Sequence, residues 1–219
     1  MANYLIIGGH GKVGMLTAPL LVKEGHTVTS VIRNPEQTAE IEATGATALV
    51  LDVETASQDE MARAFNGQDA IVWSAGAGGG NPERTYAVDR DAAIRSMDAA
   101  GQAGVKRYLM VSYQGASAQH GVPEDSSFFP YAESKGAADE HLRNSGLDWT
   151  ILGPGALTLD EPTGTIAVGS GGGDGASRDT SRGNVAQAIR VALASPNTIG
   201  QQIEFTDGEE PVTAAFVQL

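Results

Sequence analysis

Residues 4–14 read Tyr-Leu-Ile-Ile-Gly-Gly-His-Gly-Lys-Val-Gly, a short apolar run followed by glycine at positions 8, 11 and 14. The apolar run is typical of a strand, and helical spacing begins directly after the turn. In such a unit the first glycine permits the tight turn, the second lets backbone approach a pyrophosphate, and the third lets the helix pack on the strand. The helix N-terminus then faces the phosphates. A glycine-rich turn without a ligand is the alternative. We predict that a dinucleotide binds at Gly8, His10, Gly11, Lys12, Val13 and Gly14.

Short apolar runs recur outward from this turn, and most of them are continuous rather than alternating. Continuous runs are typical of strands buried on both faces of a parallel sheet. The predicted strands are residues 4–7, 27–32, 48–51, 70–74, 107–112, 149–152 and 202–205. Helical spacing between them predicts helices over residues 13–24, 35–44, 58–65, 82–104, 131–145 and 184–194. Five glycines follow these helices where a left-handed residue ends a helix: Gly25, Gly45, Gly67, Gly104 and Gly146.

This alternation of strands and helices predicts an α/β protein with a three-layer, doubly wound parallel sheet, the Rossmann fold. A chain of 219 residues suits a single domain of this kind. We expect residues 1–219 to form one NAD(P)-binding domain with a small C-terminal extension. Residues 153–182 and 206–219 are then variable substrate-side and C-terminal segments. Ligands of such sheets bind beyond the carboxyl ends of the strands.

Composition excludes several classes of function. The net charge of −13 disfavours nucleic acid as a partner, because a phosphate backbone would be repelled. The chain has no cysteine, which excludes disulfides and thiolate metal sites and suits a reducing compartment. Its four histidines never show the i, i+4 spacing of a helical metal pair. The apolar N-terminal run is too short for a signal peptide or a membrane span. We expect a cytoplasmic protein without a metal site or membrane contact.

The end of the second predicted strand indicates which dinucleotide binds. NAD-preferring folds place a carboxylate there for the ribose 2′-hydroxyl, whereas this chain has Arg33 and Asn34. An arginine can form charge-assisted hydrogen bonds to a 2′-phosphate. NADP (as NADPH) is therefore the preferred cofactor, with NAD as the alternative, and an ordinary surface arginine is the competing interpretation. After the third strand, Asp52 and Val53 are placed near the adenine, although Asp52 also suits a turn.

As a set, these motifs resemble the atypical short-chain dehydrogenase/reductase superfamily, in its NmrA-like or NAD(P)-dependent epimerase/dehydratase-like branch. The resemblance covers nearly the whole chain. It rests on the glycine turn, Arg33, Asp52-Val53, Ala75-Gly76, Val111-Ser112, Tyr131-Ala-Glu-Ser-Lys135, residues 145–152 and Pro154-Gly155. It implies that Ala75, Gly76, Pro154 and Gly155 also contact the cofactor.

Tyr131 and Lys135 are the candidate catalytic pair, because their i, i+4 spacing places both on one helix face. A neighbouring ammonium would favour the phenolate and lower the tyrosine pKa; a packed tyrosine beside a solvated lysine is the alternative. The resemblance implies that the tyrosine transfers the substrate proton, the lysine also holds the nicotinamide ribose, and a hydroxyl after the fifth strand binds the substrate oxygen. Either Ser112 or Tyr113 would supply that hydroxyl, or the site is catalytically impaired. Gly153 stands where many relatives carry arginine.

Three functions remain open from the sequence. The first is an NADP-dependent oxidoreductase of a small carbonyl, alcohol or flavin-like compound, which works by hydride transfer with Tyr131 as proton donor or acceptor. The second is a non-catalytic, NAD(P)-binding redox sensor of the NmrA-like kind. The third is a nucleotide-sugar epimerase or dehydratase, for which the chain past Pro154 looks short.

Substrate-facing residues are expected within residues 114–129. His120, Phe128 and Phe129 are the candidates for lining a pocket there, whereas Asp125 and Ser126 are interpreted as solvating the loop. Besides a small-molecule substrate, the expected partner is at most a second copy of the chain, so the protein is a monomer or a homodimer.

Overall fold

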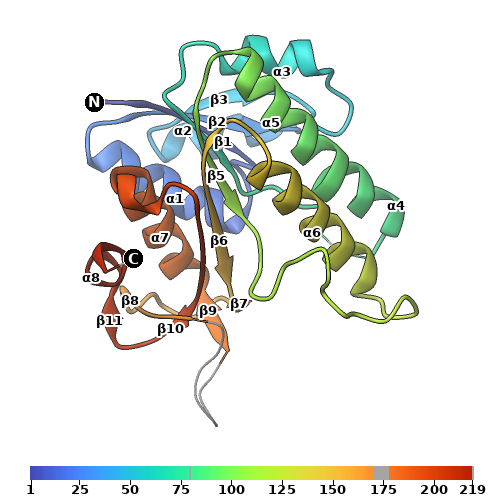
Figure 1. Cartoon of the computed structure of the whole chain (residues 1–219). Coiled ribbons are helices and arrows are strands. Elements are labelled where there is room, and N and C mark those ends of the chain that lie inside the picture. Colours follow the sequence, from blue (N-terminus) through green and yellow to red (C-terminus); the bar gives the residue numbers. More distant parts are fainter. Residues whose placement is uncertain (79, 170–177, 219) are drawn as a thin grey trace.

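A sheet of nine strands forms the centre of the computed structural model, which describes residues 1–78, 80–169 and 178–218 (Figure 1). Its order is β11-β8-β10-β6-β5-β4-β1-β2-β3. Seven strands are parallel: β1 (Asn3–Ile7), β2 (Thr27–Ile32), β3 (Thr47–Val50), β4 (Ala70–Trp73), β5 (Arg107–Val111), β6 (Asp148–Pro154) and β10 (Gln201–Asp207). All seven predicted strands are confirmed, with ends shifted by at most two residues.

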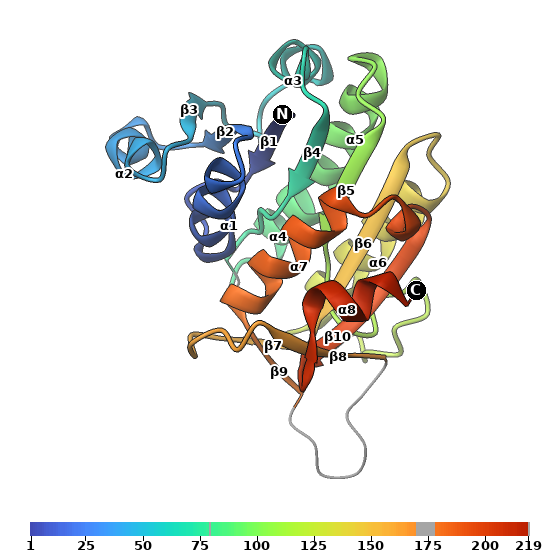
Figure 2. The same cartoon turned by 90° about the vertical axis from the view of Figure 1, so that its left-hand side faces the viewer.

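Helices cover both faces of the sheet (Figure 2). On one face lie α1 (Lys12–Lys23), α2 (Thr38–Ala43), α7 (Arg182–Ala194) and α8 (Val212–Val217), and on the other lie α3 (Gln58–Phe65), α5 (Ala93–Gln102) and α6 (Phe129–Arg143). The side chains of β1 alternate between the two cores, with Ile6 in one and Ile7 in the other. This explains why its apolar run is continuous, and it confirms the three-layer Rossmann fold. No described helix has the length and hydropathy to cross a membrane.

The helix predicted over residues 82–104 is divided into three parts. It begins as α4 (Pro82–Thr85), continues as a π-helical turn, η2 (Tyr86–Ala92), and ends as α5. The wider turn places the buried Asp89 beneath the loop after β4, where its carboxylate accepts a hydrogen bond from the Ala77 N–H at 3.0 Å. Such a turn changes the backbone hydrogen-bond register without removing the apolar periodicity, so the sequence pattern does not reveal it. Residues 35–44 divide similarly, into a 3₁₀ turn and α2.

The variable segments 153–182 and 206–219 contain elements that the sequence did not predict. In them lie β7 (Ala156–Thr158), β8 (Thr165–Val168), β9 (Asp179–Ser181), β11 (Glu210–Pro211) and α8. The main sheet is extended by β8, which pairs antiparallel with β10, and by β11, which pairs antiparallel with β8. The strands β7 and β9 pair with each other in a separate two-stranded sheet. Residues 170–177 and 219 of these segments lie outside the described residues, so half of the glycine-rich residues 164–175 do too. The rest of both segments packs on the same domain.

Four of the five predicted helix-ending glycines have the left-handed backbone conformation. Gly25, Gly45, Gly67 and Gly104 have φ between +76° and +86°. The prediction for Gly146 is wrong, because α6 ends at Arg143 and the chain turns before it reaches this glycine.

Candidate functional site

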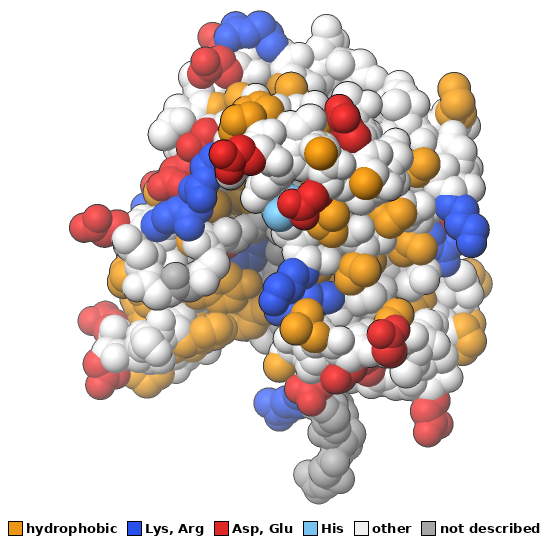
Figure 3. Space-filling view, turned by 180° about the vertical axis from the view of Figure 1, so that it is seen from behind, with side chains coloured by type: hydrophobic (Ala, Val, Ile, Leu, Met, Phe, Trp, Pro, Cys, Tyr) orange, Lys and Arg blue, Asp and Glu red, His pale blue; other side chains and the backbone are white. Residues whose placement is uncertain are grey.

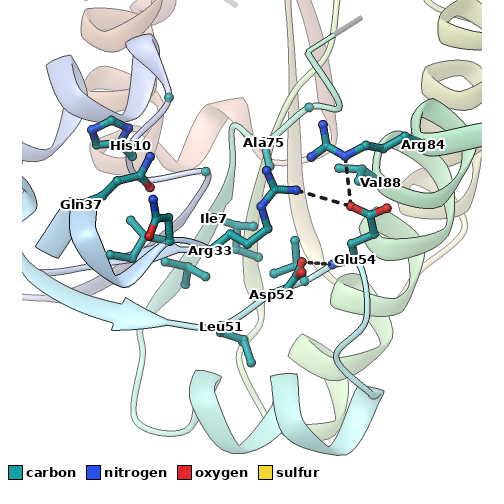
Figure 4. Close-up of a pocket in the computed structure, with 17 residues that line it drawn as sticks. Ile7, His10, Arg33, Gln37, Leu51, Asp52, Glu54, Ala75, Arg84 and Val88 are labelled. Carbon is teal, nitrogen blue, oxygen red and sulfur yellow. Dashed lines mark hydrogen bonds and ion pairs between the residues drawn. The ribbon is translucent and has the colours of Figure 1, made fainter. Parts of the chain in front are cut away.

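The order of the sheet reverses between β1 and β4, so the loops that follow these two strands diverge and leave a crevice. A cavity of about 270 Å³ lies there, lined by residues that follow the first four parallel strands, among them Gly8, Arg33, Asp52 and Ala75 (Figure 4). From behind the view of Figure 1, the molecule is hollowed, and hydrophobic side chains form part of the wall (Figure 3). The cavity occupies the position where doubly wound sheets bind their ligands.

The glycine turn is packed so closely that side chains do not fit. A Cβ atom on Gly8, whose φ is +86°, would lie 2.6 Å from the Ala75 backbone nitrogen. One on Gly14 would lie 2.6 Å from the Gly8 carbonyl oxygen, and one on Gly11 would lie 3.0 Å from the same atom. No side chain caps the N-terminus of α1 at Gly11, so its first N–H groups stay available to a ligand. This arrangement fits a dinucleotide pyrophosphate.

The other predicted residues of the turn occupy different positions. His10 lines the cavity, and its Nε2 lies 3.0 Å from a carboxylate oxygen of Glu40. Lys12 is exposed at the start of α1, and Val13 is buried beneath the turn; neither lines the cavity. Their contacts with a pyrophosphate stay a prediction.

Two arginines and one carboxylate meet in this cavity. Arg84 Nε donates to Glu54 Oε2 at 3.1 Å, and Arg33 Nη1 lies 3.7 Å from the same oxygen (Figure 4). Asp52 lines the cavity and also forms a turn, since its Oδ1 accepts from the Glu54 N–H at 3.1 Å. Neither Glu54 nor Arg84 was predicted from the sequence to belong to the site. Glu54 has a weak signal, since it follows Asp52 by two residues, whereas Arg84 comes from a distant helix and has none.

Asn34 and Val53 line the same cavity. The Asn34 side chain accepts from the Glu36 N–H at 3.0 Å, so it caps the 3₁₀ turn that follows β2. Arg33 therefore has no capping role, and at the end of β2 its guanidinium forms an ion pair with Glu54 at 3.7 Å.

Pro154 and Gly155 line neither this cavity nor the next one. A side chain on Gly155 would collide with the Arg178 carbonyl oxygen, which accepts from the N–H of Ala156. The structure thus packs Gly155 against the residue that precedes β9, whereas Pro154 ends β6 and its carbonyl accepts from the Gln114 N–H. A Cβ on Gly153 would lie 3.3 Å from the Glu204 side chain, so an acidic residue lies near the position where many relatives have arginine.

A second cavity of about 900 Å³ lies between the loop after β4 and the segment before α6. Gly76 lines both cavities, and Asp89, Phe128 and Tyr131 line the second. The expectation that His120, Phe128 and Phe129, within residues 114–129, line the substrate pocket is partly wrong. Phe128 lines the cavity together with residues 124–127, whereas His120 and Phe129 pack against each other and do not line it.

Two aromatic rings pack beside the ring of Tyr131, the candidate catalytic residue. The Tyr131 ring centroid lies 5.5 Å from that of Tyr113 and 5.4 Å from that of Phe128. Ser112 points elsewhere, since its Oγ donates to Asp139 Oδ2 at 2.5 Å inside the protein. Ser112 and Tyr113 are the two candidates for the hydroxyl that binds the substrate oxygen. Of these, Tyr113 is the residue that lies beside Tyr131.

Lys135 lies one turn after Tyr131, but its ammonium is buried in the protein. Its Nζ donates to the Val111 carbonyl at 2.8 Å and contacts Met110 Sδ at 3.1 Å. Burial raises the pKa of Tyr131, and the nearby carboxyls Asp89 and Asp139 raise it further. The expected lowering of the Tyr131 pKa by Lys135 is therefore wrong for this structure, because the ammonium is buried and donates to the Val111 carbonyl.

Asp139 makes stability depend on pH. Burial raises its pKa, against the opposing effects of Lys135 and Ser112. Because the folded-state pKa exceeds the unfolded value, Asp139 contributes stability that is present below the unfolded pKa and lost as pH rises through the folded pKa. The free energy of unfolding of the wild type minus that of Asp139→Asn should fall above about pH 4, by at most about 1.4 kcal/mol per pH unit. Urea unfolding of both proteins at several pH values measures this, and a difference that grows with pH contradicts it.

The sheet order, the glycine turn and the cavity beside it define a Rossmann-type dinucleotide-binding protein. A model of the NAD(P)H-binding family matches residues 8–196. The chain belongs to this family.

The chain is similar over its whole length to proteins of several organisms. The Bacillus subtilis protein named uncharacterized sugar epimerase YhfK is 35% identical over 221 residues, 98% of each chain. The solved structure of a putative NAD-dependent epimerase/dehydratase from Bacillus halodurans covers 100% of both chains with a TM-score of 0.90 and 31% identity. That of the oxidoreductase ylbE from Lactococcus lactis has a TM-score of 0.86 and 29% identity, and covers 99% of this chain and 96% of its own. These similarities support the assignment of the chain to the Rossmann-like NAD(P)-binding superfamily.

Proposed function

We propose that the chain is an NADPH-dependent oxidoreductase that acts on a small carbonyl, alcohol or flavin-like compound. The observation that carries the proposal is that the two cavities meet at Gly76. On one side lies the glycine turn that fits a pyrophosphate, and on the other lies the Tyr131 side chain. A dinucleotide held at the turn would extend past Gly76 toward this tyrosine.

Each part of the site has a separate task. Gly8, Gly11 and Gly14, with the N-terminus of α1, bind the pyrophosphate. The bound nicotinamide supplies or accepts the hydride. Tyr131 holds a proton at its hydroxyl at neutral pH, because burial and nearby carboxyls raise its pKa. A protonated hydroxyl suits donation to a carbonyl oxygen, which is the proton transfer that carbonyl reduction needs.

The preference for NADPH rests on Arg33. Its side chain is 57% exposed, and its Nη1 lies 3.7 Å from Glu54 Oε2, an ion pair that is longer than a hydrogen bond. Arg84 is held by both Glu54 and the Ala77 carbonyl. Arg33, which makes an ion pair but no hydrogen bond in the cavity, is therefore the less firmly held arginine and the one that we propose turns to a 2′-phosphate.

Arg33→Ala is expected to weaken NADPH binding about 10- to 100-fold and to change NADH binding less than about threefold, since charge-assisted hydrogen bonds contribute about 1.5–3 kcal/mol. Calorimetric titration with both cofactors measures the two affinities. Arg63→Ala, which removes the same charge from an exposed position on α3, is the control and should leave both unchanged. Equal weakening of NADPH and NADH would overturn the assignment of Arg33.

Activity itself is tested by NADPH oxidation with a panel of carbonyls and quinones. Multiple turnovers support an oxidoreductase. Tight NADPH binding without any turnover supports the second candidate, a redox-sensing regulator. One observation favours that candidate: both Ser112 and Lys135 are engaged inside the protein, so neither presents its polar group to the second cavity.

A nucleotide-sugar epimerase or dehydratase is the third candidate, and the name of the Bacillus subtilis relative is in line with it. Such a substrate carries a pyrophosphate, which needs cations in the substrate cavity. A sugar nucleotide that co-purifies with the chain would move this candidate to first place.

A further inference from the structure

The second cavity is acidic. Three of the side chains that line it are carboxylic, those of Asp89, Glu124 and Asp125. Among the described residues that line it, none is lysine, arginine or histidine. An anionic ligand group in this cavity would meet repulsion without a compensating cation, while a neutral or cationic one would not.

Two cations on the helices α4 and α6, which border the cavity, are already engaged by other groups. Arg84 donates to the Ala77 carbonyl at 2.6 Å and to Glu54 at 3.1 Å. Lys135 is fully buried and donates to the Val111 carbonyl. Turning either cation toward a ligand would leave a buried or paired polar group without its partner, which is costly.

The same cavity offers aromatic surface. Phe128 and Tyr131 line it, and the Tyr113 ring packs against both, at 5.3 Å and 5.5 Å between centroids. A Phe128 side chain that is 44% exposed provides apolar area for a ring to cover. Aromatic side chains bind flat apolar ligands through large contact areas and offset or edge-to-face packing.

We infer that this cavity selects uncharged or cationic aromatic carbonyl compounds and rejects phosphorylated or carboxylate-bearing ones. The inference rests on the proposed function for the role of the cavity as the substrate site, but the selection by charge is a property of binding. It therefore separates this chain from enzymes that use nucleotide sugars or other phosphate-bearing substrates.

The test uses three compounds with the same acetophenone core: 4-acetylbenzoate, its uncharged methyl ester, and the cationic 4-acetyl-N,N,N-trimethylanilinium. Saturation-transfer NMR on the full chain, with and without NADP⁺, measures binding, and NADPH oxidation measures turnover. At low ionic strength we expect the anion to bind at least about tenfold more weakly than the ester, and the cation to bind as well as the ester or better.

Variants that remove charge test whether the carboxylates of the cavity cause the discrimination between anionic, neutral and cationic compounds. The double variant Glu124→Gln/Asp125→Asn should bring the affinities of the three compounds closer together and leave that of the ester unchanged. Glu42→Gln, an exposed change on α2, is the control and should leave the tenfold difference intact.

The outcomes distinguish the two proposals. A preference for the anion, or no binding of any of the three compounds, overturns the inference. If the order of binding holds and no compound is turned over, the inference about the cavity stands and the proposed oxidoreductase activity fails.

Discussion

Tyr131→Phe is expected to lower kcat/KM for carbonyl reduction by about 10²- to 10⁴-fold, the usual contribution of a general acid. The substitution removes only the hydroxyl, so the ring can keep its packing against Tyr113 and Phe128. NADPH affinity should therefore change less than about twofold. Steady-state kinetics and calorimetric titration measure the two quantities separately.

The control for this variant is Tyr86→Phe. Tyr86 lies on η2 with Arg90 over its ring and lines neither cavity, so losing its hydroxyl should leave turnover unchanged. Unchanged turnover in Tyr131→Phe would remove the tyrosine from the mechanism.

The pH profile gives an independent check on Tyr131. Because burial and the carboxyls raise its pKa, the hydroxyl keeps its proton throughout the neutral and mildly alkaline range. The rate of carbonyl reduction should therefore show no decline from loss of this proton below about pH 10. A decline near neutral pH that disappears in Tyr131→Phe would instead mean that Lys135 lowers the tyrosine pKa in the working complex.

The parts of the fold that the sequence predicted are those governed by local pattern. A strand such as β1 is buried on both faces, so its apolar run is visible without knowledge of its neighbours. The glycine turn is equally local, because the close approach of Gly14 to the Gly8 carbonyl involves residues six apart. The cofactor turn and the parallel sheet could therefore be predicted.

The parts that the sequence did not predict depend on contacts between distant residues. The strand β8 has four residues, and it becomes a strand by pairing with β10, about 40 positions later. The pairing of Arg84 with Glu54 joins helix α4 to the loop after β3, and the two meet only in the folded chain. Short elements with polar neighbours carry no periodicity strong enough to show such pairings.

The Tyr131 and Lys135 pair shows the limit of a spacing rule. A separation of four residues places both on one helix face, as the structure confirms, but does not decide where a long side chain ends. Here the Lys135 ammonium reaches past the helix to the Val111 carbonyl at the end of β5. The carboxyls of Asp89 and Asp139, from two different helices, then become the charged groups that raise the Tyr131 pKa.

Gly8→Ala is expected to lower the free energy of unfolding by several kcal/mol and NADPH affinity by at least about 100-fold. The new Cβ would lie 2.6 Å from the Ala75 nitrogen and 2.7 Å from the Ala75 Cα, so the β1 turn and the loop after β4 would have to separate. These two loops border the cofactor cavity, so the same displacement should disrupt binding. Urea unfolding and calorimetric titration with NADPH measure the two effects.

Gly25→Ala is the matched control for Gly8→Ala. Gly25 has nearly the same φ, +85° against +86°, but no atom lies within 4 Å of its added Cβ. It should lose only about 1 kcal/mol of stability from backbone strain and bind NADPH normally.

If Gly8→Ala does not fold, Gly11→Ala keeps the test decisive, because Gly11 has an ordinary φ of −65°. Its Cβ would narrow the turn at 3.0 Å from the Gly8 carbonyl, so that variant should fold and bind NADPH at least about tenfold more weakly. Normal NADPH binding by both Gly8→Ala and Gly11→Ala would show that the pyrophosphate does not lie on this turn.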